Sequence, residues 1–184
     1  MDPPEYALVT RVFGNTLPFR HRILITDAAG LDGRPFTIPT TLIGEILSVS
    51  PALFFGALGT SMACSGLAVE YLASSVINLA YLINVGRAYA YGSLAARPIA
   101  GLLVHETTHV WQGKNSTFAL SYVFNSLYNQ RVLADAYAYS PNRDWHSYNV
   151  EQQAKIVEDW FMGGEPTSGD LYPYIANNIQ KGDA

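Results

Sequence analysis

Residues 105 to 109 read His-Glu-Thr-Thr-His, a spacing that suits metal chemistry. In a helix, His105 and His109 lie one turn apart on the same face, so both imidazoles can reach one Zn²⁺ at about 2.0–2.1 Å. Glu106 can take a proton from a water on the metal and later pass it to a leaving amine. The segment therefore predicts a zinc centre with a carboxylate base, as metal-assisted peptide hydrolysis requires. The alternative, an ordinary helix with two surface histidines, hardly explains a charged residue in this apolar setting.

A catalytic zinc takes three protein ligands and keeps one position open, so a further ligand must come from elsewhere. Glu151, near the start of a second expected helix, is our candidate, because a helix packed against residues 105–109 can present a carboxylate from the opposite wall. The alternative is a solvated glutamate in a first helical turn. Glu158 and Asp135 are rivals for the ligand position, and Asp135 could instead hold a ligand histidine in place from outside.

Three side chains between the motif and Glu151 could polarise a peptide carbonyl or hold an oxyanion. They are Tyr137, Tyr139 and His146, and a structural role is the alternative for each. We keep His146 as a candidate catalytic residue, because histidine is the most frequent proton-transfer group in enzymes. His21 stands between two arginines and is expected at the surface.

Short β-branched segments predict strands in the first half of the chain. We interpret residues 6–40 as β structure, with strands at 22–26 and 34–39. Prolines at both ends of the second strand favour an edge position. Residues 81–86 predict a third strand, which is a candidate edge for an added peptide strand.

Helical periodicity dominates the remaining segments. Apolar residues recur at helical spacing around the histidine motif, where Pro98 suits a first turn and Gly113 suits an end. A second amphipathic pattern carries Glu151 and is ended by Gly163. Helices are expected at 42–83 with breaks, 97–113, 117–130, 149–161 and 169–181. We interpret residues 1–184 as one α+β domain, mostly helical.

Composition supports a folded domain and excludes some partners. Hydrophobic residues make up 49% and charged residues 14% of the 184 residues, the opposite of a disordered chain. The net charge is −4 and no Lys/Arg cluster exceeds the arginines that flank His21, so nucleic acid is not expected as a partner. The single cysteine, Cys64, cannot form an internal disulfide and is expected as a small buried hydrophobe.

The longest uncharged run covers residues 46–69, which is long enough to span a bilayer. Pro51 and the glycines inside it favour instead a buried helix pair, or an apolar loop that touches a membrane surface or a substrate. The N-terminus lacks the basic and apolar segments of a secretory signal peptide. We expect export by another route, with the chain either complete or the C-terminal part of a longer protein.

The string His-Glu-Thr-Thr-His-Val-Trp-Gln at 105–112, with Asn-Val-Glu-Gln-Gln-Ala at 149–154, resembles the gluzincin branch of the zincin metallopeptidases. It is similar to a narrower set, the metallopeptidase-like toxin domains at the C-terminus of VgrG spike proteins of bacterial type VI secretion systems. The resemblance spans roughly residues 80–162. Many gluzincins carry an aspartate four residues after the ligand glutamate, where this chain has Lys155.

The resemblance implies a zincin-like fold with a small sheet beside the active-site helix. It implies His105, His109 and Glu151 as zinc ligands and Glu106 as the base. It also implies an antibacterial effector that acts on a protein or peptide in the periplasm of a target bacterium, with a cognate immunity protein as partner. Two alternatives stay open: a membrane-active toxin that uses residues 46–69, and an inactive scaffold that binds a partner. In the first of these, zinc would only stabilise the fold.

Overall fold

The structure is a computed structural model that describes residues 1–27, 35–40, 79–86, 88, 92–96, 99–116 and 136–184. Several expected features lie outside these residues: the apolar run at 46–69, the helices within 42–78 and at 117–130, Cys64 and Asp135. Within the described residues, no helix is both long enough and apolar enough to cross a membrane.

The chain begins with a helix, α1 (Pro3–Phe13), so our expectation of β structure from residue 6 is wrong at its start. The side chain of Asp2 accepts a hydrogen bond from the backbone of Glu5, whose own side chain accepts one from the backbone of Asp2. This capping box satisfies free N–H groups of the first turn, and the fixed φ of proline suits that turn. The cap therefore outweighs the β-branched residues that follow it.

A small mixed sheet forms where three strands were predicted. It consists of β1 (Ile23–Thr26), β2 (Phe36–Pro39) and β3 (Tyr81–Asn84), in the order β1-β3-β2. β3 runs parallel to β1 and antiparallel to β2. The edge position of β2 is confirmed. The expectation that β3 offers a free edge is wrong, because both of its sides are paired and all four of its residues are buried.

The histidine motif lies on α5 (Ala100–Asn115), most of whose residues are buried. Because other elements cover most of its surface, this helix has no solvated polar face, and polar residues such as His105, Glu106 and Thr108 are buried together with its apolar ones. The sequence led us to expect that Gly113 ends this helix, and that expectation is wrong. Gly113 lies inside the last turn, and the backbone N–H of Ser116 still donates to the carbonyl of Gln112.

The helix that carries Glu151 is α7 (Val150–Met162), as predicted. Asn149 caps its start through a capping box with Gln152, and Gly163 follows its end. The expected last helix is shorter and broken into α8 (Tyr172–Asn177) and a 3₁₀ turn. The described 3₁₀ turns are η1 (Gly14–Thr16), η2 (Arg20–Arg22), η5 (Trp145–Ser147) and η6 (Ile179–Lys181).

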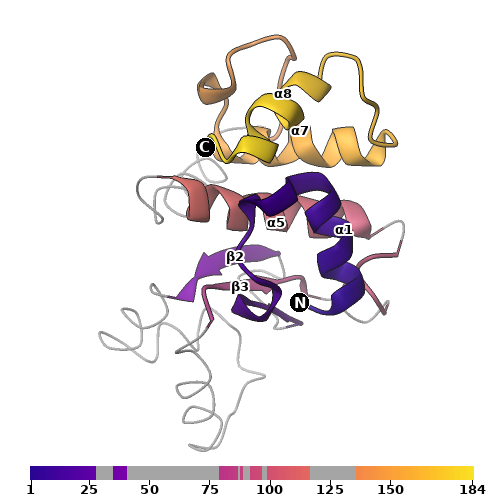
Figure 1. Ribbon diagram of the computed structural model, residues 1–184, viewed down its shortest axis with the longest axis vertical. Coiled ribbons are helices and arrows are strands. Elements are labelled where there is room, and N and C mark those ends of the chain that lie inside the picture. The colour runs from indigo at the N-terminus through magenta and orange to yellow at the C-terminus, as the bar shows by residue number, and fades with distance from the viewer. Residues whose placement is uncertain (28–34, 41–78, 87, 89–91, 97–98, 117–135) are drawn as a thin grey trace, which may run out of the picture.

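Helix α5 forms the central layer of the described structure (Figure 1). The sheet packs on one side of it through β2 and β3, α7 packs on the other, and α1 also contacts it. The α+β class and the small sheet beside the motif helix are thus confirmed. The core includes Phe13, Trp111 and Ile175, and the indole N–H of Trp111 donates to the carbonyl of Ile179.

Gly101 allows α5 and α7 to approach closely. A Cβ atom at this position would lie 3.1 Å from Sδ of Met162 and 3.5 Å from Cγ of Glu158. We expect Gly101→Leu to lower the free energy of unfolding by roughly 1–3 kcal/mol, because the larger side chain pushes α7 outward. Urea denaturation measures the change. Ala7→Leu, at an exposed position of α1, is the matched control, and equal stability of the two variants would contradict this packing.

Candidate metal centre

Two imidazoles and one carboxylate converge between α5 and α7. Nε2 of His105 lies 3.3 Å and Nε2 of His109 lies 3.5 Å from the same oxygen, Oε2 of Glu151. One ligand atom from each of the three residues lies within 4.8 Å of the others. Two nitrogen donors and one oxygen donor at this separation could hold a metal ion.

The exposed fractions of the two histidines and of Glu151 decide between a buried metal site and solvated surface residues. His105 and His109 are 8% and 5% exposed, so the reading of two surface histidines is wrong. Glu151 is 1% exposed, although a solvated glutamate in a first helical turn would face water. The packing of α7 on α5 therefore places the Glu151 carboxylate, which belongs to α7, next to the two histidines of α5.

Glu158 occupies the other face of the first histidine. Its Oε2 lies 3.1 Å from Nδ1 of His105, whereas Glu151 faces Nε2 of the same ring. A carboxylate accepts the Nδ1 proton, which leaves the lone pair of Nε2 for a metal. Among the described residues, the group that could hold a metal therefore includes Glu151 and not Glu158, which faces the opposite nitrogen of the His105 ring.

Gln112 accepts the Nδ1 proton of the second histidine, His109, an interaction that we did not predict. Its Oε1 lies 2.8 Å from Nδ1 of His109, and its amide group donates to Oε1 of Gln153 and to the carbonyl of Val150. Gln153 in turn donates to the carbonyl of Trp145. This chain of amides fixes the second imidazole and joins α5 to α7. The available sequence signal was a glutamine three residues after a histidine, one helical turn away.

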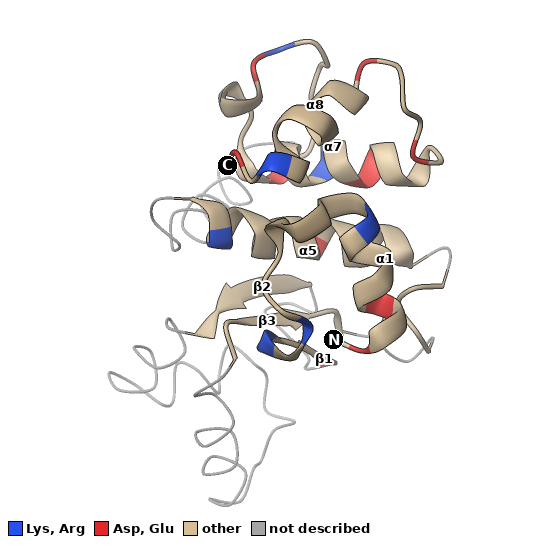
Figure 2. Ribbon diagram, in the orientation of Figure 1, with Lys and Arg blue, Asp and Glu red and all other residues tan. Residues whose placement is uncertain are grey.

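Lys155 follows Glu151 by four residues on α7, at the position where the sequence departs from the gluzincin pattern that it otherwise resembles. Its Nζ lies 2.7 Å from Oδ1 of Asp159 and 3.6 Å from Oε1 of Glu158. The carboxylate on His105 therefore comes from Glu158, seven residues after Glu151, and Lys155 flanks it with a positive charge. Both α5 and α7 contribute acidic residues to the described structure (Figure 2).

Glu106 lies on the same helix as both histidines and is 5% exposed. The hydroxyl of Thr37, on β2, lies 2.8 Å from its Oε2. Burial raises the pKa of Glu106, against the lowering effects of His109, His105 and the Thr37 hydrogen bond. A raised pKa makes the carboxylate a stronger proton acceptor than a carboxylate in water.

The other predicted side chains among the described residues contribute no donor atom to this cluster. His146 is exposed, and its Nε2 lies 3.6 Å from Oδ2 of Asp183, so the structure does not bring it to the cluster. Tyr137 is closer, with its ring centroid 5.9 Å from that of His105. The hydroxyl of Tyr139 donates to Asp159.

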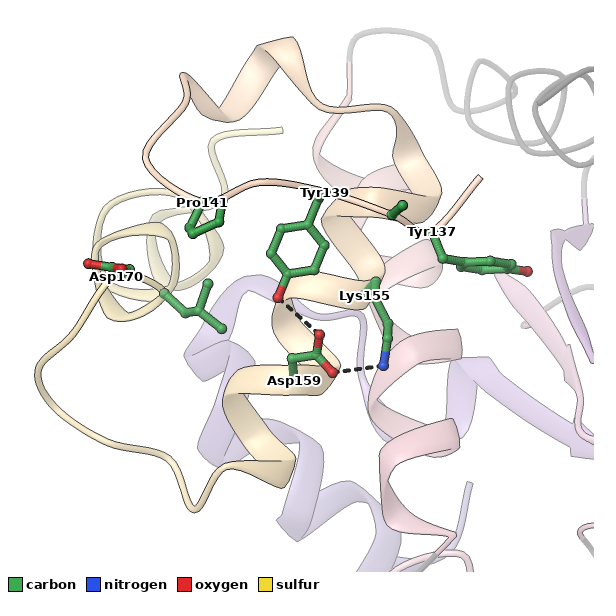
Figure 3. A pocket seen from close by; sticks show the side chains of 8 residues that line it. Tyr137, Tyr139, Pro141, Lys155, Asp159 and Asp170 are labelled. Carbon is green, nitrogen blue, oxygen red and sulfur yellow. Dashed lines mark hydrogen bonds and ion pairs between the residues drawn. The ribbon is translucent and has the colours of Figure 1, made fainter. Parts of the chain in front are cut away.

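A pocket lies beside α7, next to these tyrosines. It has a volume of about 590 Å³ and is lined by Tyr137, Tyr139, Pro141, Lys155, Asp159, Asp170 and two other residues (Figure 3). Tyr137 links it to the donor cluster, because this side chain borders the pocket and also lies against His105. His21 is exposed and stacks on Phe19, which agrees with its expected surface position.

This chain is similar in part to a curated protein. The chain is 33% identical over 102 residues to "Type VI secretion system spike protein VgrG2b" of Pseudomonas aeruginosa. The match covers 52% of this chain and 10% of the spike protein, so the chain spans about a tenth of its relative's length. No protein-family model and no solved structure matches. The predicted resemblance to a VgrG spike protein is confirmed over this part of the chain.

Removal of the Glu158 carboxylate should weaken metal binding. We expect Glu158→Ala to lower the affinity for Zn²⁺ roughly 10–100-fold, because the Nδ1 proton of His105 loses its acceptor. Glu158→Gln retains an oxygen acceptor and should lose less. Competition with a chromophoric chelator measures the affinity, and Asp170→Ala, at an exposed site, is the control. Wild-type affinity in Glu158→Ala would contradict the orienting role.

The metal-free protein should lose stability as pH rises. Burial lowers the pKa of His105, but hydrogen bonds to Glu151 and Glu158 outweigh it and raise the pKa from 6.5 to about 10. The folded state thus holds this proton more tightly than the unfolded state. Its stabilising contribution is present below about pH 6.5 and is lost as pH rises toward 10. The pKa values of Glu106 and His109 are also raised, so these two groups likewise lower the stability of the folded state as pH rises.

Urea denaturation in the presence of a chelator, from about pH 6 to about pH 10, measures this loss. His105→Gln should show a shallower dependence on pH, because the ring that holds the extra proton is gone. A stability that increases over this range in the wild-type protein would contradict the arrangement.

Proposed function

We propose that this chain is a zinc-dependent peptidase domain, delivered through a type VI secretion system as an antibacterial effector. The observation that carries the proposal is the convergence of two Nε2 atoms and the Glu151 carboxylate beside the buried carboxylate of Glu106. Metal ligands and a proton acceptor on one helix are the parts that hydrolysis of an amide requires.

The donor set fits zinc. His105 and His109 offer imidazole nitrogens, and Glu151 offers a carboxylate oxygen, the combination that three-ligand catalytic zinc sites use. Acceptors at both Nδ1 atoms leave the Nε2 lone pairs for the metal. Since the three residues are buried, a bound cation would also compensate the cost of placing the Glu151 carboxylate in the interior.

The residues of this chain divide the chemistry between them. A zinc ion held by the three donors would polarise a peptide carbonyl and lower the pKa of a water molecule. Glu106 accepts a proton as the water oxygen forms its bond to the carbonyl carbon. It then gives this proton to the amide nitrogen as the C–N bond breaks, which releases an amine and a carboxylic acid. Glu106 thus ends in the ionised state in which it began.

The architecture supports a zincin-like fold. The motif helix α5 packs between a small sheet and α7, which carries the third donor. Similarity to a VgrG spike protein supports delivery by type VI secretion. We further propose that the domain acts in the periplasm of a target bacterium, cleaves a protein or peptide there and is inhibited by a cognate immunity protein.

Glu106→Gln tests the proposal most simply. The amide keeps the size of the side chain but cannot accept the proton, so we expect Zn²⁺ to bind as in wild type while peptide cleavage falls by roughly 10²–10⁴-fold. Elemental analysis gives the zinc content, and an internally quenched peptide library gives the cleavage rate. Glu165→Gln, far from α5 in the sequence, is the matched control.

Toxicity after expression in the periplasm of a Gram-negative reporter strain provides a second readout. Wild type should arrest growth and Glu106→Gln should not. Cleavage or toxicity that persists unchanged in a zinc-binding Glu106→Gln protein would contradict the peptidase proposal and favour a structural zinc site.

A further inference from the structure

We propose that Thr37 is a positioning residue for Glu106, which holds the carboxylate in the orientation that proton transfer needs. The inference rests on the proposed function, since it assigns Glu106 as the base. It adds a residue from β2, one of the two edge strands of the described sheet, to a site otherwise built from α5 and α7.

The contact is short, buried and specific. Oγ1 of Thr37 lies 2.8 Å from Oε2 of Glu106 and 3.1 Å from the backbone carbonyl oxygen of the same residue. Thr37 is 6% and Glu106 is 5% exposed. A hydroxyl carries one proton, and the shorter distance to a charged acceptor assigns that proton to the carboxylate.

Strand β2 gives the hydroxyl a fixed position. Thr37 lies opposite Ile83 in the antiparallel β2–β3 pair, and its side chain points to the side of the sheet that packs on α5. A β-branched side chain has few χ1 rotamers, so a threonine on a paired strand holds its hydroxyl with little freedom. A longer polar side chain could not reach the same point with the same rigidity.

With the hydrogen bond to Thr37 in place, the two oxygens of the Glu106 carboxylate have different roles. Oε2 of Glu106 accepts from Thr37, and we assign Oε1 to the water proton. Without the hydroxyl, the carboxylate can rotate about its terminal bond, because sp³–sp² torsions are broad. A buried carboxylate that loses a donor also loses part of the compensation for its burial. Thr37 therefore acts on the geometry of the base and leaves the donors of His105 and His109 in place.

Thr37→Val and Thr37→Ser separate this role from simple packing. Valine keeps the shape and removes the hydroxyl, whereas serine keeps the hydroxyl. On the quenched peptide library, we expect kcat of Thr37→Val to fall roughly 10–100-fold with little change in KM, and Thr37→Ser to stay within about threefold of wild type. The affinity for Zn²⁺ should stay at the wild-type value in both variants.

Infrared spectroscopy supplies a readout that does not depend on a substrate. The carboxylate bands of Glu106, identified by subtraction of the Glu106→Gln spectrum, should shift in Thr37→Val and return in Thr37→Ser. Thr40→Val is the matched control, because its hydroxyl is equally buried near the end of β2 but donates to the carbonyl of Leu79. If Thr37→Val does not fold, Thr37→Ala takes its place.

The outcomes distinguish this inference from the proposed function. Unchanged kcat and unchanged carboxylate bands in Thr37→Val would overturn the role of Thr37 while the peptidase proposal stands. An equal loss of zinc affinity and activity would also overturn it, because the residue would then be structural. If wild type cleaves no peptide, the proposed function fails, and the infrared bands still decide whether Thr37 holds Glu106.

Discussion

A buried carboxylate shared by two buried imidazoles is the interaction on which the rest of this structure depends. Ionisable groups in an interior are costly unless they are paired or bind a metal, and Glu151, His105 and His109 are each less than a tenth exposed. Their pairing requires α5 and α7 to pack face to face. The glycine at position 101, the capped start of α7 and the amide chain from Gln112 serve that packing.

The central helix explains how few elements build the site. Because α5 is covered by the sheet on one side and by α7 on the other, it presents different residues to each layer. The side toward α7 carries the imidazoles, which meet Glu151 and Glu158. The side toward β2 carries Glu106, which meets Thr37. The two candidate metal ligands on α5 and the proposed base thus share one helix but take their supporting contacts from opposite layers.

Local signals in the sequence predicted the parts of the site that one segment contains. The spacing of His105, Glu106 and His109 places them on a helix, and the caps of α7 follow from Asn149 and Gly163. These local signals could not predict the contacts between residues that are far apart in the sequence. The acceptors on the two Nδ1 atoms depend on how α7 sits on α5, and the central place of β3 depends on long-range pairing. The capping box of α1 was readable in the sequence, but the β-branched residues after it misled the prediction.

X-ray absorption at the zinc K-edge of the zinc-loaded protein tests whether His105, His109 and Glu151 bind the metal. We expect one tightly bound zinc per chain, with two imidazole ligands at about 2.0–2.1 Å and oxygen ligands completing a four-coordinate shell. The loss of one imidazole signal in each of His105→Ala and His109→Ala would identify the two rings. A protein that binds no stoichiometric zinc, or a spectrum without imidazole scattering, would contradict this expectation.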